Sequence, residues 1–367
     1  MDHQQQSQKQ DYGFGVAEQK LPAEAYYQRP RQNNRNLAVI LIIVGALWLA
    51  IELMGNGFFF GARSQSNLQR FPASSEQIVF DLGSANLVLE VEERDDIVVE
   101  LVERGFWGSN TMVSEQGSRQ LTIRNRASGL CFSNCDVSYR VVMPADLALE
   151  IQTDSGDIQL KGDLGPVVLN TLSGDVKIQE SDDPLEVSSG SGEIVLERIT
   201  ADISAHSNSG DICLDTINAE RAEVSSNSGE VQLKAVDAQV VQVTTSSGDI
   251  SFAGSAEQLE LLSSSGQIKV ENEQAQSLNL ETGSGDIRYR GGLSGRSSIA
   301  SSSGDVELKL SDPSNLRVDA KTSSGSIDSN LKLTLEENSE HVLVGSMGDG
   351  SVQLSITTSS GDVRISN

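Results

Sequence analysis

Residues 241–270 read VQVTTSSGDISFAGSAEQLELLSSSGQIKV and hold two successive copies of one short pattern. In each copy, apolar residues alternate with polar ones, a Ser-Gly pair follows, and a second alternating run begins two residues after the glycine. Alternation with a period of two is typical of a β-strand that buries one face. Each copy therefore predicts two short strands that are joined by a corner at the Ser-Gly pair.

The Ser-Gly pair recurs along most of the chain. Its glycine is found at Gly156, Gly174, Gly192, Gly210, Gly229, Gly248, Gly266, Gly285, Gly304, Gly325 and Gly361. The successive intervals are 18, 18, 18, 19, 19, 18, 19, 19, 21 and 36 residues. This period is typical of one solenoid coil, and not of a propeller blade or a helical repeat. We therefore predict an all-β fold, a single-stranded parallel β-solenoid (β-helix) of about 18–19 residues per coil.

The positions around the glycine indicate how a coil is built. The residue two after it is Ile or Val in every copy, as at Ile212 and Val231, and the residue three before it is Ser or Thr. Both positions have inward parity, so we expect the hydroxyls to form a hydrogen-bonding ladder along the stack. Glycine adopts positive φ without steric cost, and Ser and Asp bond nearby backbone groups, so the corner is expected to be a positive-φ turn.

Composition and charge limit the classes of function. The chain has 367 residues, of which 4% are aromatic and 33 are Gly, a composition that suits a thin stacked core. Asp and Glu number 52 against 27 Lys and Arg, which gives a net charge of −25. This charge argues against a nucleic-acid partner, because phosphate binding needs basic patches. The acidic residues are expected mainly to keep an elongated surface soluble.

One segment has the composition of a membrane anchor. Residues 37–54 read LAVILIIVGALWLAIELM, with Glu52 as the only charge, and apolar character resumes at residues 58–60. Such a stretch is long enough to cross a bilayer as a helix, and it starts too late for a cleaved secretory signal. Arg29, Arg31 and Arg35 precede it, so the positive-inside bias favours a cytoplasmic N-terminus and an extracytoplasmic solenoid at the cell membrane.

The chain is thus expected to have five parts. A disordered cytoplasmic tail (1–36) precedes the transmembrane anchor (37–60) and a linker (61–75). Residues 76–150 contain strand-like runs without regular Ser-Gly spacing and are interpreted as irregular coils with insertions, which form a cap. Residues 151–367 form the regular solenoid, and residues 326–350 break the period near its end. Irregular ends are expected, because bare strand edges pair with other chains.

The sequence does not favour an enzyme. Asp follows the corner glycine seven times, and Glu193 and Glu230 replace it in two further copies, so this acid has a repeated role that turn stabilisation explains. The alternative is that one of these carboxylates acts as a general acid or a general base. No run of substitutions builds an acidic or basic cluster in a lateral groove, as a solenoid polysaccharidase would need. No cofactor is expected.

The positions of the histidines and acids in the sequence do not predict a metal site. His3 lies in the tail, His206 has outward parity, and His341 lies in the irregular terminal region, so a zinc or Ser-His-Asp site would need distant coincidences. Calcium is an alternative, because repeated Gly-Asp turns occur in calcium-binding β-rolls. One carboxylate per coil, however, supplies too few oxygen ligands for such a site. No metal site is predicted.

The three cysteines differ in context. Cys131 and Cys135 are close together in the loop-like stretch GLCFSNC, and outside the cytoplasm we expect them to form a small disulfide, with two unpaired thiols as the alternative. Cys213 lies between Ile212 and Leu214, which are expected to face the core. Strand parity therefore predicts that Cys213 points outward and is reactive, although free Cys is usually buried.

The repeat also resembles a known family. The Ser-Gly turns, the segment VSYRVVMPADLALEIQTDSGDIQL at 137–160 and the closing VQLSITTSSGDVRI are similar to the putative-adhesin family of bacterial membrane-anchored β-solenoids, a domain of unknown function. The likeness covers about residues 76–367. It implies a protein tethered to the bacterial cell envelope, and some members resemble components of envelope-stress responses. It transfers no catalytic residue.

Two functional hypotheses follow. The first is a non-catalytic surface interaction module, in which the solenoid binds a protein, a glycan or an envelope polymer. The second is an accessory or sensor protein of an envelope-stress response, in which tail and anchor contact membrane partners. A glycan-active enzyme is a distant third. Deletion of residues 1–36 separates the first two, because it should abolish signalling and leave ligand binding intact.

Overall fold

The computed structural model describes residues 65–107, 110–127 and 130–367, without the side chains of residues 65, 104–110 and 127–135. These residues belong to one compact unit, Ala62–Asn367. The predicted tail (1–36), the predicted anchor (37–60) and the start of the linker lie outside the described residues. Within the described ranges, no helix combines the length and the hydropathy that crossing a bilayer requires.

Each regular coil contributes two strands, one on either side of the corner glycine. We call the strands before the glycine the leading layer and those after it the trailing layer. The first leading strands are β8 (Ala148–Thr153), β10 (Val167–Thr171), β12 (Leu185–Ser191) and β14 (Ile203–Ser209). The first trailing strands are β9 (Ile158–Leu164), β11 (Val176–Ser181) and β13 (Ile194–Ile199). Every strand pairs in parallel with its counterpart in the next coil, so the prediction of a mostly parallel all-β stack is confirmed.

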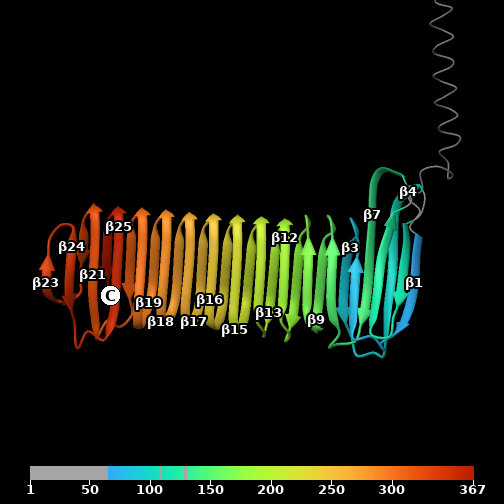
Figure 1. Ribbon diagram of the computed structural model, residues 1–367, viewed down its shortest axis with the longest axis horizontal. Helices are drawn as coiled ribbons and strands as arrows, with labels where there is room; N and C mark the ends of the chain where they lie inside the picture. Colours follow the sequence, from blue (N-terminus) through green and yellow to red (C-terminus); the bar gives the residue numbers. More distant parts are fainter. Residues whose placement is uncertain (1–64, 108–109, 128–129) are drawn as a thin grey trace, which may run out of the picture. The chain divides into compact units, whose positions relative to one another are not determined.

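The middle coils contain longer strands that bend around a second corner. They are β15 (Ile212–Ser228), β16 (Val231–Ser247), β17 (Ile250–Ser265), β18 (Ile268–Ser284) and β19 (Ile287–Ser303). Pairing between β15 and β16 continues through Ile217↔Val236, Asn218↔Asp237 and Ala219↔Ala238. Each of these strands therefore supplies the trailing side of one coil, the second bend and the leading side of the next coil (Figure 1).

The core is a thin apolar column between the two layers. Burial alternates along the strands, as in β10, where Val167, Leu169 and Thr171 are buried and the residues between them are exposed. The Ile or Val two residues after the corner glycine is buried in every copy except the last in space, where Ile327 is partly buried. The inward parity that the sequence predicts for this position is confirmed. Because one coil cannot cover its own apolar face, its stability depends on the coils on both sides.

The N-terminal end combines two parallel coils with antiparallel strands. β2 (Gln77–Asp81) and β3 (Asn86–Val91) pair with β8 and β9 on one side, and with β6 (Gln120–Ala127) and β7 (Leu130–Met143) on the other. β4 (Asp96–Trp107) lies antiparallel to β7, β1 (Gln65–Pro72) to β4, and β5 (Asn110–Gln116) to β6. The irregular coils that the sequence predicts in 76–150 are thus two coils, stacked in inverted order, and an antiparallel cover.

The C-terminal end also stacks out of sequence order. Its strands are β20 (Val306–Leu310), β21 (Leu316–Ser324), β22 (Ile327–Ser329), β23 (Thr334–Asn338), β24 (Val342–Ser346), β25 (Val352–Ser360) and β26 (Val363–Ser366). β25 pairs with both β19 and β21, and β26 pairs with both β20 and β22. The last coil of the sequence therefore lies between two earlier coils, and the antiparallel strands β24 and β23 follow β21 (Figure 1).

Candidate binding surface

The eleven corner glycines lie on top of one another, and this stacking is what excludes a side chain. A Cβ at any of them would lie within 3.0 Å of a backbone carbonyl oxygen of the coil before it in space. Seven of these glycines have φ between 115° and 155°, namely those at 174, 192, 229, 285, 304, 325 and 361. Positive φ in this range is absent at the other four, which are Gly156, Gly210, Gly248 and Gly266. Close approach of neighbouring coils is therefore the requirement that all eleven share, and positive φ is an additional one at seven.

The Ser or Thr three residues before each glycine is buried, as the parity predicts. The hydroxyls do not bond one another, so the predicted hydroxyl ladder is wrong. Several donate instead to the carbonyl oxygen of the neighbouring corner glycine, as Thr282 Oγ1 does to Gly266 O at 2.9 Å and Thr322 Oγ1 to Gly361 O at 3.1 Å. Thr171 and Ser189 donate within their own turn. These hydroxyls therefore satisfy carbonyls that the narrow corner would otherwise leave without a donor, whereas the buried hydroxyls of Ser207, Ser226 and Thr245 have no hydrogen-bond partner among the described residues.

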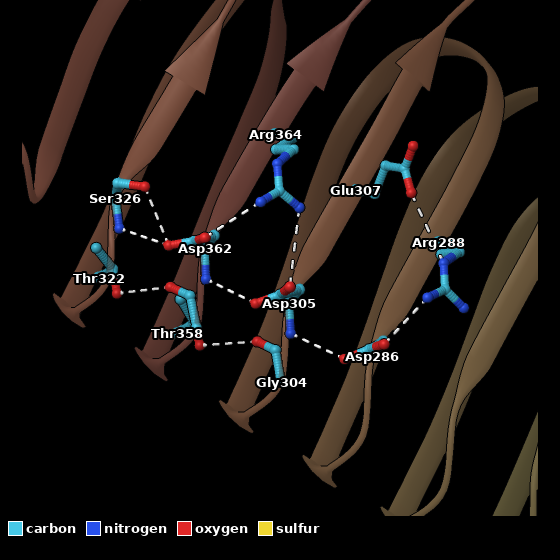
Figure 2. Close-up of polar contacts among 11 residues, drawn as sticks. Asp286, Arg288, Gly304, Asp305, Glu307, Thr322, Ser326, Thr358, Asp362 and Arg364 are labelled. Carbon is cyan, nitrogen blue, oxygen red and sulfur yellow. Dashed lines mark hydrogen bonds and ion pairs between the residues drawn. The ribbon is translucent and has the colours of Figure 1, made fainter.

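The Asp after the corner glycine forms a bond from coil to coil. Asp305 Oδ1 accepts the backbone N–H of Asp362 at 2.9 Å, and Asp286 Oδ1 accepts that of Asp305 at 3.0 Å (Figure 2). The same contact joins Asp157 to the N–H of Asp175, Asp175 to that of Glu193, Asp211 to that of Glu230, and Asp249 to that of Gln267. We call this series the Asp ladder. It assigns the repeated acid a structural role between coils, whereas the stabilisation of its own turn that the sequence suggests stays a prediction.

Arginines pair with the last rungs of the ladder. Arg288 Nη2 lies 3.1 Å from Asp286 Oδ2, and Arg364 Nη2 lies 3.2 Å from Asp362 Oδ2 (Figure 2). Asp362 Oδ1 also accepts the backbone N–H of Ser326 at 2.9 Å and its hydroxyl at 3.0 Å. These two bonds from Ser326, followed by the charge of Arg364, hold the pKa of Asp362 below its ordinary value. Asp362 is therefore ion-paired and hydrogen-bonded in a way that opposes the raised pKa of a general acid.

The histidines lie apart from one another. His206 is half-buried on the outer side of β14, and its Nδ1 lies 2.8 Å from Ser225 Oγ. His341 is exposed, and its Nδ1 lies 2.8 Å from the carbonyl oxygen of Gly325. His3 lies outside the described residues. In the part of the chain that the structure describes, no three His, Cys, Asp or Glu side chains are grouped so that they could hold a metal ion.

Cys213 has the predicted direction, whereas its reactivity stays a prediction. Ile212 and Leu214 are both 0% exposed, and Cys213 between them is half-buried on the outer face. Burial, and secondarily the carboxylates of Asp215 and Glu193, raises the pKa of the thiol above its ordinary value. A raised pKa reduces the fraction of the thiol that is present as the reactive thiolate. The side chains of Cys131 and Cys135 lie outside the described part of the structure, so their disulfide stays a prediction.

The outer surface contains features that the repeat alone does not reveal. The residue before every corner glycine is Ser, and nine of these eleven serines are exposed. A groove of about 420 Å³ follows the second bend and is lined by the exposed acids Asp202, Glu220, Asp237 and Glu257, so the expectation that no lateral groove has an acidic cluster is wrong. Another groove of about 420 Å³ crosses the leading layer near the N-terminal coils.

Sequence reasoning missed both grooves for a definite reason. The acids of the second bend lie in segments whose length differs from coil to coil, so they do not align on the corner glycine. The groove on the leading layer includes Asp81 and Gly83, which lie in the coil before the first regular repeat. The only signal in the sequence was the outward position of His206, Asn170 and Asn208 on leading strands.

Part of the repeat is similar to a described domain. Residues 198–366 match the model of Toastrack DUF4097, a domain of unknown function. Solved structures with similar chains include a "putative adhesin" from Parabacteroides distasonis ATCC 8503, at 16% identity over 67% of this chain and 98% of that one, with a TM-score of 0.41. A "putative lipid binding protein" from the same organism is similar at 18% identity over 68% and 96%, with a TM-score of 0.36. A "putative adhesin" from Parabacteroides merdae ATCC 43184 is 18% identical over 66% and 96%, with a TM-score of 0.36. None of the curated proteins matches the chain.

Proposed function

We propose that this chain is a membrane-anchored, extracytoplasmic β-solenoid that acts as a non-catalytic, adhesin-like interaction module. The observation that carries the proposal is the division of polar groups between scaffold and surface. Most repeated acids and many inward hydroxyls are bonded between coils, as at Asp305 and Thr282. The exposed serines and the outward residues of the leading layer remain for contacts with other molecules. The partner is a protein, a glycan or an envelope polymer.

The apolar segment 37–60 supports the anchor, and the arginines before it support an extracytoplasmic solenoid. The envelope-stress sensor remains a second candidate, because the tail of 36 residues would face the cytoplasm in this topology. In the solenoid itself the aspartates of the Asp ladder are bonded to backbone N–H groups, and some also to arginines, which favours a structural role for them over catalysis.

A topology and capture experiment tests the proposal. Protease added to intact cells that express the full chain should remove the solenoid and leave residues 1–36 protected. The full chain, recovered from cross-linked envelopes, should retain a bound envelope component both with and without residues 1–36. A protected solenoid would contradict the localisation. Loss of envelope contacts together with the tail would favour the sensor.

A further inference from the structure

The groove on the leading layer has the shape and chemistry of a ligand site. It crosses the outer face of the N-terminal coils from Asp81 and Gly83, over β8, β10 and β12, to His206 and Asn208 on β14. It therefore runs along the stack, perpendicular to the strands. Concave surfaces on which a few polar groups converge are the usual form of small-molecule and oligomer sites.

A missing side chain forms the depression. In each coil the residues four and two before the corner glycine point outward, and in the middle coil these are Ser188 and Gly190. A Cβ at Gly190 would lie within 3.0 Å of the carbonyl oxygen of Leu172 in the preceding coil. The depression is thus built into the packing of β10 against β12. Beside it, the side chain of Leu172 is 68% exposed.

Several hydrogen-bonding groups around this depression are available. His206 uses Nδ1 for Ser225, which leaves Nε2, and Asn208 Oδ1 accepts from Asn227 Nδ2 at 3.0 Å, which leaves the Asn208 amide N–H₂. The exposed amide of Asn170 has no hydrogen-bond partner among the described residues. Two amides and an imidazole therefore line the same groove as one exposed aliphatic side chain.

This combination fits an uncharged sugar chain. Sugar hydroxyls both donate and accept hydrogen bonds, as amides and a neutral imidazole do, and the C–H faces of a sugar ring can cover Leu172. Asp81 and Asp154 at one end, and a net charge of −25, disfavour uronic acids and phosphates. A peptide strand would add to a sheet edge, but here the backbone groups of β10 and β12 already pair with each other.

We propose that the groove between Asp154 and Asn208 binds a segment of an uncharged oligosaccharide. Asn170 and His206 contribute hydrogen bonds, and Leu172 the apolar contact. This inference rests on the proposed function, since it names the ligand class of one part of the interaction surface.

Binding of neutral oligosaccharides of two to six sugars to the purified full chain in detergent tests the inference, with uronic-acid chains of equal length as the comparison. We expect neutral chains to bind and Asn170→Ala to weaken binding about tenfold, the loss of one or two hydrogen bonds. Ser188→Tyr should fill the depression and abolish binding. Thr244→Ala is the matched control, because Thr244 holds the position of Asn170 four coils further on and is exposed.

Each outcome decides the question. The inference is overturned if no neutral chain binds, if uronic-acid chains bind more tightly, or if both groove variants bind like the Thr244→Ala control while melting at the same temperature. The proposed function is judged separately. If the full chain still retains envelope material when the groove variants have no effect, the interaction module stands and its ligand site lies elsewhere.

Discussion

At the scale of single residues, two requirements for glycine can be separated: the close approach of neighbouring coils and a positive φ. Gly248 lacks positive φ, yet a Cβ there would collide with the carbonyl oxygen of Gly229. Gly83 has φ of +57°, yet a Cβ there would meet nothing within 4 Å. The chain thus offers one glycine that is needed for close approach alone and another that is needed for conformation alone.

We therefore predict that Gly248→Ala destabilises the solenoid more than Gly83→Ala does. The strain at Gly83 should cost about 1 kcal/mol, whereas overpacking against a backbone that cannot move freely should cost about 3 kcal/mol. Thermal melting followed by circular dichroism measures both. Equal losses, or a larger loss for Gly83→Ala, would show that stacking does not determine the glycine position.

The Asp ladder makes a second prediction at this scale. Among the described residues, no carboxylate of Glu193 or Glu230 accepts the N–H of the next coil, because the longer side chain places its oxygens differently. Asp249→Asn keeps an acceptor for the N–H of Gln267 and should be nearly neutral. Asp249→Glu should cost about 1 kcal/mol by leaving that N–H without its partner. Chemical denaturation compares the two, and an Asn variant as unstable as the Glu variant would assign the effect to charge.

At the scale of elements, the first corner could be predicted from the sequence and the second could not. Ser-Gly is constant at the first corner, because a side chain there meets the neighbouring backbone. Six residues further on, the chain turns with positive φ at Gly162, Glu180, Arg198, Thr216 and Ala235. These residues share a positive φ but no chemistry, so no sequence pattern reveals the bend.

The second bend leads to an engineering prediction. Thr216 is β-branched and has φ of +61°, a conformation that such residues rarely adopt. Thr216→Gly should therefore raise stability by about 0.5–1 kcal/mol, since the relief of strain exceeds the extra entropy of the unfolded chain. Thr244→Gly, in an extended strand, is the control and should destabilise by a similar amount. A lower melting temperature for Thr216→Gly would mean that the turn is not strained.

At the scale of the whole molecule, the repeat predicts the coils but not their order. The 36 residues between Gly325 and Gly361 suggest an interruption followed by one more coil at the end. Gly361 instead lies against Gly304, and Gly325 lies against Gly361. Spacing along a chain specifies where a coil occurs in the sequence, whereas its neighbours in space depend on which edges remain open when it folds. The groove on the leading layer could not be predicted from the sequence for a related reason. Asp81 lines it together with residues of later coils, which are distant in the sequence.

The inserted coil makes the last strands interdependent, and this can be tested in β25. Ile356 is buried between β19 and β21, whereas Thr357 beside it is exposed. Ile356→Asp places a charge in the core, so β25 should detach at a cost of several kcal/mol. Since β21 pairs with β25, its amides at 316–324 should then exchange as fast as those of an unfolded segment, while β16 stays protected. Thr357→Asp should change neither region. If β21 keeps its protection in Ile356→Asp, it can pair directly with β19, and the stacking order would not be what holds the C-terminal end together.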